Sequence, residues 1–318
     1  MIGTPALWLG FIGGVILLLL IDLFVVHRHP HKVSMKEAGA WSVFWVALSL
    51  VFAGCVGHFF GRTKAIEFLG GYAVEKALSI DNLFVFLVLL TTFKVPKEQR
   101  HGLLFWGVLG ALVLRGIFIA VGSAMIERFH ITLYIMGVLL VIIGARMIIP
   151  DKEEAAVEKA AEPPKGKKLA KWFKRFIPTT DGYREGKFFV HENGKYLATP
   201  LFIALLAIEV TDVIFAVDSV PAVFGVTRDP FIVFTSNALA ILGLRSLFFV
   251  LASMIEKFRF LRVGLAIILT FVGTKMVLAH WWHTPMEQSV AFIGIVLLLC
   301  VVGSVVYNRF SWRPTTTT

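Results

Sequence analysis

Cysteine and charged residues are scarce in this chain of 318 residues. The two cysteines, Cys55 and Cys300, stand singly in apolar stretches, which excludes a disulfide framework and a Cys-x-x-Cys redox pair. Charged residues make up only 16% of the sequence and apolar residues 57%, whereas a globular domain averages roughly a quarter charged. The composition therefore excludes an ordinary soluble protein and predicts an all-α polytopic membrane protein.

About nine stretches are long and apolar enough to cross roughly 30 Å of hydrocarbon as helices. The first lacks a basic leader and a small-residue cleavage site, so we expect a membrane helix rather than a removable signal peptide. The stretches cover about residues 6–26, 38–58, 67–92, 101–122, 130–149, 200–224, 230–253, 260–279 and 288–308.

A net charge of +10 would suggest a nucleic-acid partner in a soluble protein, but here its distribution excludes one. Most of the 31 lysines and arginines fall in one set of loops, and the opposite loops contain only Arg62, Lys64, Arg128 and Arg228. Basic loops of membrane proteins face the cytoplasm. We therefore expect the N-terminus outside, the C-terminus in the cytoplasm, and the lipid bilayer as the partner of these charges.

Two segments of three predicted helices, residues 67–149 and 200–279, resemble each other. When their acidic helices are aligned, Arg115 matches Arg245, and the later Gly-Ala-Arg-Met of the first segment matches Gly-Thr-Lys-Met of the second. Because each unit has an odd number of helices and one cytoplasmic loop joins them, the second unit must be inverted. Inverted repeats are typical of secondary transporters, whose substrate binds near mid-membrane between the repeats.

The remaining segments flank or join these units. We expect residues 1–66 to form two helices and residues 280–318 a ninth helix with a tail. Residues 150–199 form a cytoplasmic loop, in which residues 169–176 have the spacing of an interfacial helix and Asn193-Gly194 predicts a hairpin turn. This loop is either a regulatory domain or a clip at the membrane surface.

Five carboxylates interrupt the apolar helices that open the two units. A carboxylate in the bilayer costs at least a few kcal/mol, so each needs a ligand, an ionic partner or an aqueous cavity. The same spacing occurs in both helices: an acid, five residues, a second acid and a polar residue. The predicted site residues are Glu75, Asp81, Asn82, Glu209, Asp212, Asp218 and Ser219.

Helix geometry does not place all these acids on one face. Asp81 lies roughly 120° around an ideal helix from Glu75, and Asp218 lies equally far from Asp212. The two aspartates therefore either contact other neighbours or lie in broken helices. Pro221 favours a break in the second helix, because proline removes a backbone hydrogen bond.

The donors in these motifs are carboxylates, an amide and hydroxyls, without His, Cys or Met. Oxygen donors suit Mg²⁺, Ca²⁺ and Mn²⁺ and argue against zinc or copper. The residues therefore predict a hard or borderline divalent cation as the substrate, and they do not distinguish among these metals.

Basic residues also lie inside the predicted helices, and we expect them to carry the counter-charge of the acids. One interpretation is a permanent salt-bridge network; the other is that the bases hold the acids only while the metal is absent. Protons are a further candidate counter-ion, since a carboxylate in a membrane can exchange a metal for a proton. The predicted counter-charge residues are Lys76, Arg115, Arg245 and Lys275.

Three classes of function are weighed against the sequence. A transporter moves the cation by alternating access between the repeats. An enzyme is not expected, and neither is a bound cofactor: the Gly-x-Gly-Asp motif of intramembrane aspartyl proteases is absent, and so are the His pairs or thiols of a redox centre. A metal sensor or scaffold would bind partners through residues 150–199 and needs no path to both faces.

Three motifs resemble the TerC family, and within it the Alx-like branch. They are the sequences at 75–82, at 209–224 and at 235–245, and the resemblance extends over essentially the whole chain. It implies an inner-membrane protein of the LysE-type transporter superfamily that exports manganese, with the predicted acidic residues as the metal site. Some members of the family are described instead as membrane-bound redox modulators. Manganese and the direction of transport come from the resemblance alone.

Overall fold

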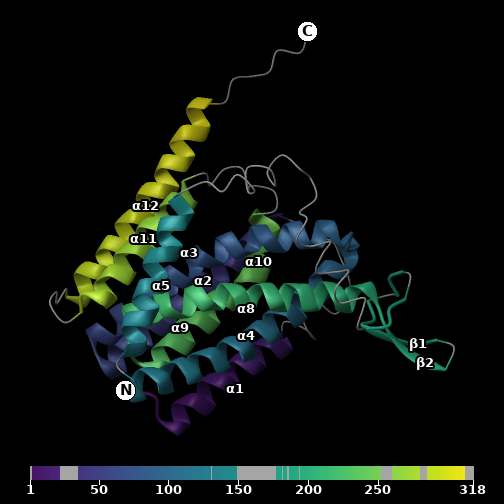
Figure 1. Ribbon diagram of the computed structural model, residues 1–318, viewed down its shortest axis with the longest axis horizontal. Helices are drawn as coiled ribbons and strands as arrows, with labels where there is room; N and C mark the ends of the chain where they lie inside the picture. Colours follow the sequence, from purple (N-terminus) through teal and green to yellow (C-terminus); the bar gives the residue numbers. More distant parts are fainter. Residues whose placement is uncertain are drawn as a thin grey trace.

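The structure is a bundle of helices with a small β-hairpin at one end (Figure 1). This computed structural model describes residues 2–21, 35–129, 131–148, 177–180, 182–184, 186–192, 194–251, 260–279 and 285–311. The expected interfacial helix at 169–176 lies outside these residues.

Every predicted apolar stretch contains helix in the described residues. Helices α2, α4, α8 and α12 are long and apolar enough to cross a membrane, and shorter apolar helices accompany them. The all-α, polytopic membrane class is therefore confirmed. The helices are α1 (Pro5–Ile21), α2 (Met35–Phe60), α3 (Arg62–Thr92), α4 (Lys97–Arg128), α5 (Ile131–Ile148), α8 (Pro200–Val226), α9 (Pro230–Leu242), α10 (Leu244–Leu251), α11 (Leu261–Val277) and α12 (Met286–Ser311).

The helix break lies elsewhere than the proline predicts. Both α3 and α8 are continuous, so the alternative in which Asp81 and Asp218 lie in broken helices is wrong. Pro221 is buried inside α8, where packing compensates for one lost backbone bond. The stretch at 230–253 is divided instead at Gly243 into α9 and α10.

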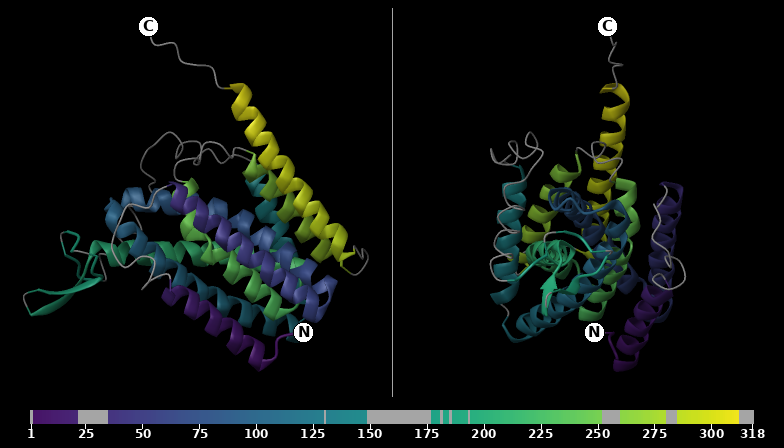
Figure 2. Two further views of the ribbon diagram at one scale, coloured as in Figure 1. Left: turned by 180° about the vertical axis from the view of Figure 1, so that it is seen from behind. Right: turned by 90° about the vertical axis from the view of Figure 1, so that its right-hand side faces the viewer.

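Helices α3, α4 and α8 run side by side, with α9 packed on both α3 and α4 (Figure 1). Helices α5, α11 and α12 cross this layer steeply at one end, which the turned views also show (Figure 2). In contacts between the predicted repeats, α3 packs on α9, α4 on α8, and α5 on α11. If a two-fold axis relates the units, the first helix of each must pack on the second helix of the other, and the two third helices must pack together. These contacts have that pattern, and the division into repeats itself stays a prediction.

Glycines bring α5 and α11 into close contact. A Cβ atom added at Gly273 would lie 2.5 Å from the carbonyl oxygen of Gly137, and one added at Gly137 would lie 2.9 Å from the carbonyl oxygen of Gly273. Small residues let membrane helices approach until their backbones touch. This pair therefore fixes the third helices of the two predicted units against each other.

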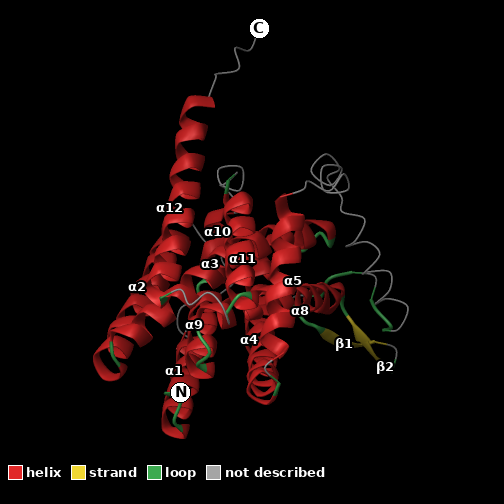
Figure 3. Ribbon diagram, turned by 60° about the vertical axis from the view of Figure 1, so that its left-hand side comes forward, coloured by secondary structure: helices red, strands yellow, loops and turns green. Residues whose placement is uncertain are grey.

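The predicted hairpin is confirmed. Strands β1 (Phe189–Glu192) and β2 (Lys195–Ala198) pair antiparallel, with Glu192 opposite Lys195. Gly194 has a φ of 73°, as the second residue of an Asn-Gly turn requires. Figure 3 shows the two strands projecting beyond the end of α8.

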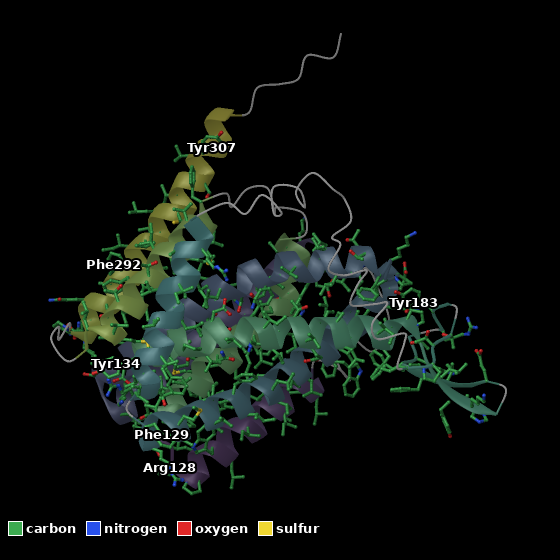
Figure 4. All side chains as sticks on the ribbon, in the orientation of Figure 1. Arg128, Phe129, Tyr134, Tyr183, Phe292 and Tyr307 are labelled. Atoms are coloured by element: carbon green, nitrogen blue, oxygen red, sulfur yellow. The ribbon has the colours of Figure 1, made fainter. Side chains whose placement is uncertain are left out.

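Tyr183 ties the hairpin segment to the bundle. Its hydroxyl donates a 2.6 Å hydrogen bond to the carbonyl oxygen of Phe93, the residue that ends α3. Burial raises the pKa of Tyr183 to about 12, so the hydroxyl remains a proton donor at neutral pH. Figure 4 shows Tyr183 at the opposite end of the bundle from Arg128 and Phe129.

Substituting Gly273 tests the contact between α5 and α11. Gly273→Ala places a methyl group against a backbone carbonyl that cannot rotate away, so we expect a loss of about 1–3 kcal/mol in the free energy of unfolding. Thermal unfolding of the detergent-solubilised protein measures it. Gly294→Ala is the matched control on α12, where an added Cβ meets nothing within 4 Å. Equal stability of the two variants would contradict this packing.

Candidate functional site

An arginine binds two carboxylates inside the bundle. Arg115 projects from the middle of α4, and its side chain is 1% exposed. Its Nε and Nη2 donate to the two carboxylate oxygens of Asp212, at 3.0 and 2.9 Å. Its Nη1 donates to Glu75 Oε1 and, at 3.1 Å, to the hydroxyl of Ser219. One guanidinium thus joins three helices.

Helical spacing brings these partners together. Asp212 and Ser219 lie seven residues apart on α8, which is close to two turns, so both face the same neighbour. Glu75 comes from α3, which packs along α8. All three side chains are at most 3% exposed. The polar face predicted for each acidic helix therefore points into the bundle.

Glu209 adds a third carboxylate one turn before Asp212. A Cβ atom at Gly110 of α4 would lie 2.1 Å from Glu209 Oε1, so this glycine leaves the space that the carboxylate fills. The second oxygen, Oε2, is buried and has no hydrogen-bond partner among the described residues. Arg115 engages only Glu75 and Asp212 among these three acids, so one guanidinium is present for three carboxyl groups.

Several polar atoms of the helices that carry or adjoin this group are buried without a partner among the described residues. An unpaired buried polar atom costs roughly 1–3 kcal/mol, so such atoms favour bound water or a ligand. They come from α3, α8 and α9. The atoms are Glu75 Oε2, Ser79 Oγ, Asn82 Nδ2, Glu209 Oε2 and Asn237 Nδ2.

Three of the predicted site residues, Glu75, Asp212 and Ser219, meet at Arg115, and the others lie on the same two helices. Asn82 is buried two turns beyond Glu75 on the same face of α3. Asp218 precedes Ser219 on α8 and is half-buried. Asp81 belongs to α3 and Arg245 to α10, and the structure describes the backbone alone at these two positions.

Two predicted counter-charges lie elsewhere. Lys76 Nζ donates a 3.2 Å hydrogen bond to the carbonyl oxygen of Ala240. Lys275 Nζ donates to the hydroxyl of Ser289 at 2.9 Å. Both ammonium groups therefore contact neutral oxygens, and among the predicted bases whose side chains the structure describes, Arg115 is the one that contacts the acids.

Asn237 is a polar residue of this region that the sequence prediction of the site did not include. It lies in α9, is 1% exposed, and follows two buried hydroxyl residues. The signal was present, because three consecutive polar residues interrupt an otherwise apolar stretch. Without a charge among them, they could not be distinguished from ordinary helix hydroxyls that bond to their own backbone.

The acids do not form an open metal cage in this conformation. In the part of the chain that the structure describes, no three His, Cys, Asp or Glu side chains are arranged to hold an ion. The guanidinium takes both oxygens of Asp212 and one of Glu75. A cation can use these oxygens only if Arg115 releases them.

A cavity of about 460 Å³ lies at one end of the bundle. Its wall includes Lys64 and Glu67 of α3, and the end of α8 up to Val226, one to two turns beyond Ser219. Glu67 Oε2 accepts hydrogen bonds from Lys64 at 2.8 Å and from the Thr227 hydroxyl at 2.6 Å. The cavity is thus a vestibule with a mixed polar and apolar wall, on the side predicted to be outside.

Removing the guanidinium should unfold or loosen the bundle. In Arg115→Gln, Glu75 and Asp212 keep buried charges without a partner, so we expect a loss of about 3–5 kcal/mol in the free energy of unfolding. Adding Glu75→Gln and Asp212→Asn should recover part of it. Unfolding in detergent measures both effects.

Arg128→Gln is the matched control, because this arginine ends the same helix and is exposed. A surface change of this kind usually stays within about 0.5 kcal/mol. If Arg115→Gln were as stable as Arg128→Gln, the ion-pair group would not hold the three helices.

Comparison with known proteins agrees with this architecture. A protein of Myxococcus xanthus named "Uncharacterized membrane protein STKORF319" is 46% identical over 97% of this chain and 94% of its own length. The Escherichia coli K12 protein named "Putative membrane-bound redox modulator Alx" is 42% identical over 97% of both chains. No solved structure matches. The model of the "Integral membrane protein TerC family" matches residues 60–311, and the chain therefore belongs to the TerC family of integral membrane proteins.

Proposed function

We propose that this protein exports a divalent cation, Mn²⁺, across a bacterial inner membrane by alternating access at the Arg115 site. The observation that supports it is a group of three carboxylates inside the bundle that only one guanidinium balances. An ion-pair group with a structural role alone is most stable when each buried acid has its own partner.

Charge and donor type favour a divalent cation. Glu75, Glu209 and Asp212 are three acids, so a divalent ion would offset more of their negative charge than the single guanidinium that it replaces. The donors are oxygens, which suits Mn²⁺, Mg²⁺ and Ca²⁺. The choice of manganese, like the export direction, rests on the resemblance to the TerC family.

Alternating access gives the arginine a role in transport. In the closed conformation Arg115 supplies the positive charge that the acids need inside the membrane. When a path opens, a cation can take over the carboxylates while the guanidinium turns away. The vestibule beside Glu67 then offers an exit on the side that the positive-inside rule places outside the cell.

The name of the Escherichia coli relative points to redox modulation, which is a different function. In this chain the two cysteines lie on different helices, α2 and α12, and both are free thiols. Neither belongs to the buried ion-pair group, so a thiol-based function would leave that group unexplained. A metal sensor or scaffold would use the group, but it would not need access from both sides of the membrane.

Cellular manganese tests the export. In cells challenged with manganese, we expect the wild-type chain to lower the metal content, and Asp212→Asn to slow export about tenfold because it removes a charged donor. Elemental analysis measures the metal content. Asp81→Asn and Asp218→Asn extend the test to the predicted aspartates.

Glu127→Gln is the control, since this exposed carboxylate lies on α4 away from the acids. If the wild-type chain left cellular manganese unchanged, export would be wrong. If wild type and Asp212→Asn lowered it equally, these carboxylates would not be the site.

Proton exchange makes a separate prediction. If each metal leaves in exchange for protons, an imposed pH gradient should accelerate Mn²⁺ flux in vesicles containing the purified protein, and reversing the gradient should slow it. A manganese-sensitive dye inside the vesicles follows the flux. Identical rates with and without the gradient would exclude proton antiport and leave Mn²⁺ transport itself standing.

A further inference from the structure

Lys76 faces away from the acids although it follows Glu75 in the sequence. Adjacent residues point about 100° apart around a helix. Glu75 therefore faces α4 and α8, whereas the Lys76 ammonium reaches α9 and donates to the carbonyl oxygen of Ala240 at 3.2 Å. One turn of α3 thus contacts both the ion-pair group and a different helix.

The contact lies at the break between α9 and α10. Ala240 belongs to the last turn of α9, and Gly243 is the residue between the two helices. A Cβ atom at Gly243 would lie 2.8 Å from Lys76 Nζ and 3.1 Å from Trp45 Cβ. The missing side chain therefore leaves the space that the ammonium occupies.

Electrostatics favours this place for the ammonium. The last carbonyl groups of a helix carry a partial negative charge, and lysine side chains commonly bind them. An ammonium ion in a membrane helix has few other neutral partners. Lys76 therefore caps the end of α9, a role different from the predicted counter-charge.

The same turn of α9 carries a second buried polar residue. Asn237, whose amide nitrogen is buried without a partner among the described residues, lies three residues before Ala240. Residues three apart on a helix are close neighbours. Lys76 thus links the turn of α3 that carries Glu75 to the last turns of α9.

We propose that Lys76 is a positioning residue that couples the acidic site to the break between α9 and α10. This inference rests on the proposed transport function. When α3 shifts to let Glu75 exchange Arg115 for a cation, Lys76 moves with it and pulls or releases the end of α9. Gly243 serves as the point at which α9 and α10 change their angle.

Transport kinetics separate this role from metal binding. In proteoliposomes we expect Lys76→Met to lower the maximal rate of Mn²⁺ flux about tenfold while the Mn²⁺ concentration for half-maximal flux changes less than about twofold. Lys76→Arg keeps a donor in reach and should recover most of the rate. Lys36→Met is the control, since this lysine is exposed on α2.

Hydrogen exchange provides a test that does not need transport. The amides of residues 239–247 should exchange faster in Lys76→Met than in wild type, and Lys76→Arg should resemble wild type. If Lys76→Met fails to fold, Gly243→Ala provides a second test. Its added methyl group forces the ammonium away, so the same amides should exchange faster than in wild type.

The outcomes distinguish this inference from the proposed function. Lack of Mn²⁺ flux in the wild-type protein overturns the transport proposal and, with it, the coupling. Normal flux and normal exchange in Lys76→Met overturn the coupling alone. If Lys76→Met instead raised the Mn²⁺ concentration for half-maximal flux about tenfold, Lys76 would belong to the ion site, and this result would also overturn the positioning role.

Discussion

The buried contact of Arg115 with Glu75 and Asp212 is the constraint on which the rest of the structure depends. Charges inside a membrane bundle are tolerated only when they are paired and hydrogen-bonded. Here the pairing partners come from α3, α4 and α8, so these helices must lie side by side with their polar faces inward. Glycines allow the closest approaches in this bundle. Gly110 leaves room for the Glu209 carboxylate, and two glycines let α5 and α11 touch.

The interaction that stabilises the bundle also fills the site where a cation would bind. The guanidinium engages both oxygens of Asp212, while Glu209, Asn82 and Asn237 have buried polar atoms without a partner among the described residues. Under the proposed function, the group would alternate between a state paired with Arg115 and a state that holds the metal ion. Alternating access requires two such states of similar energy, so an arginine among the proposed metal ligands would take part in transport.

The helices and the acidic centre could be predicted because both follow from the free energy of placing each residue in the membrane. The length of each apolar stretch predicts a membrane helix, and a carboxylate within one needs a partner, which identified Glu75, Asp212 and Arg115. Partners of Lys76 and Lys275 could not be predicted, since a lysine side chain reaches a carbonyl or a hydroxyl on another helix as readily as an acid. The break followed Gly243 rather than Pro221, because tertiary packing holds α8 straight, a constraint that no local pattern contains.

Direct binding of Mn²⁺ to the purified protein tests the central claim, that the carboxylates held by Arg115 are the metal site. Free Mn²⁺ gives a strong paramagnetic resonance signal, which decreases as the ion binds. The account predicts that the wild-type protein removes about one ion per chain from solution and that Asp212→Asn binds at least about tenfold more weakly, since the residue supplies two of the oxygens. Equal binding by wild type and Asp212→Asn would contradict it.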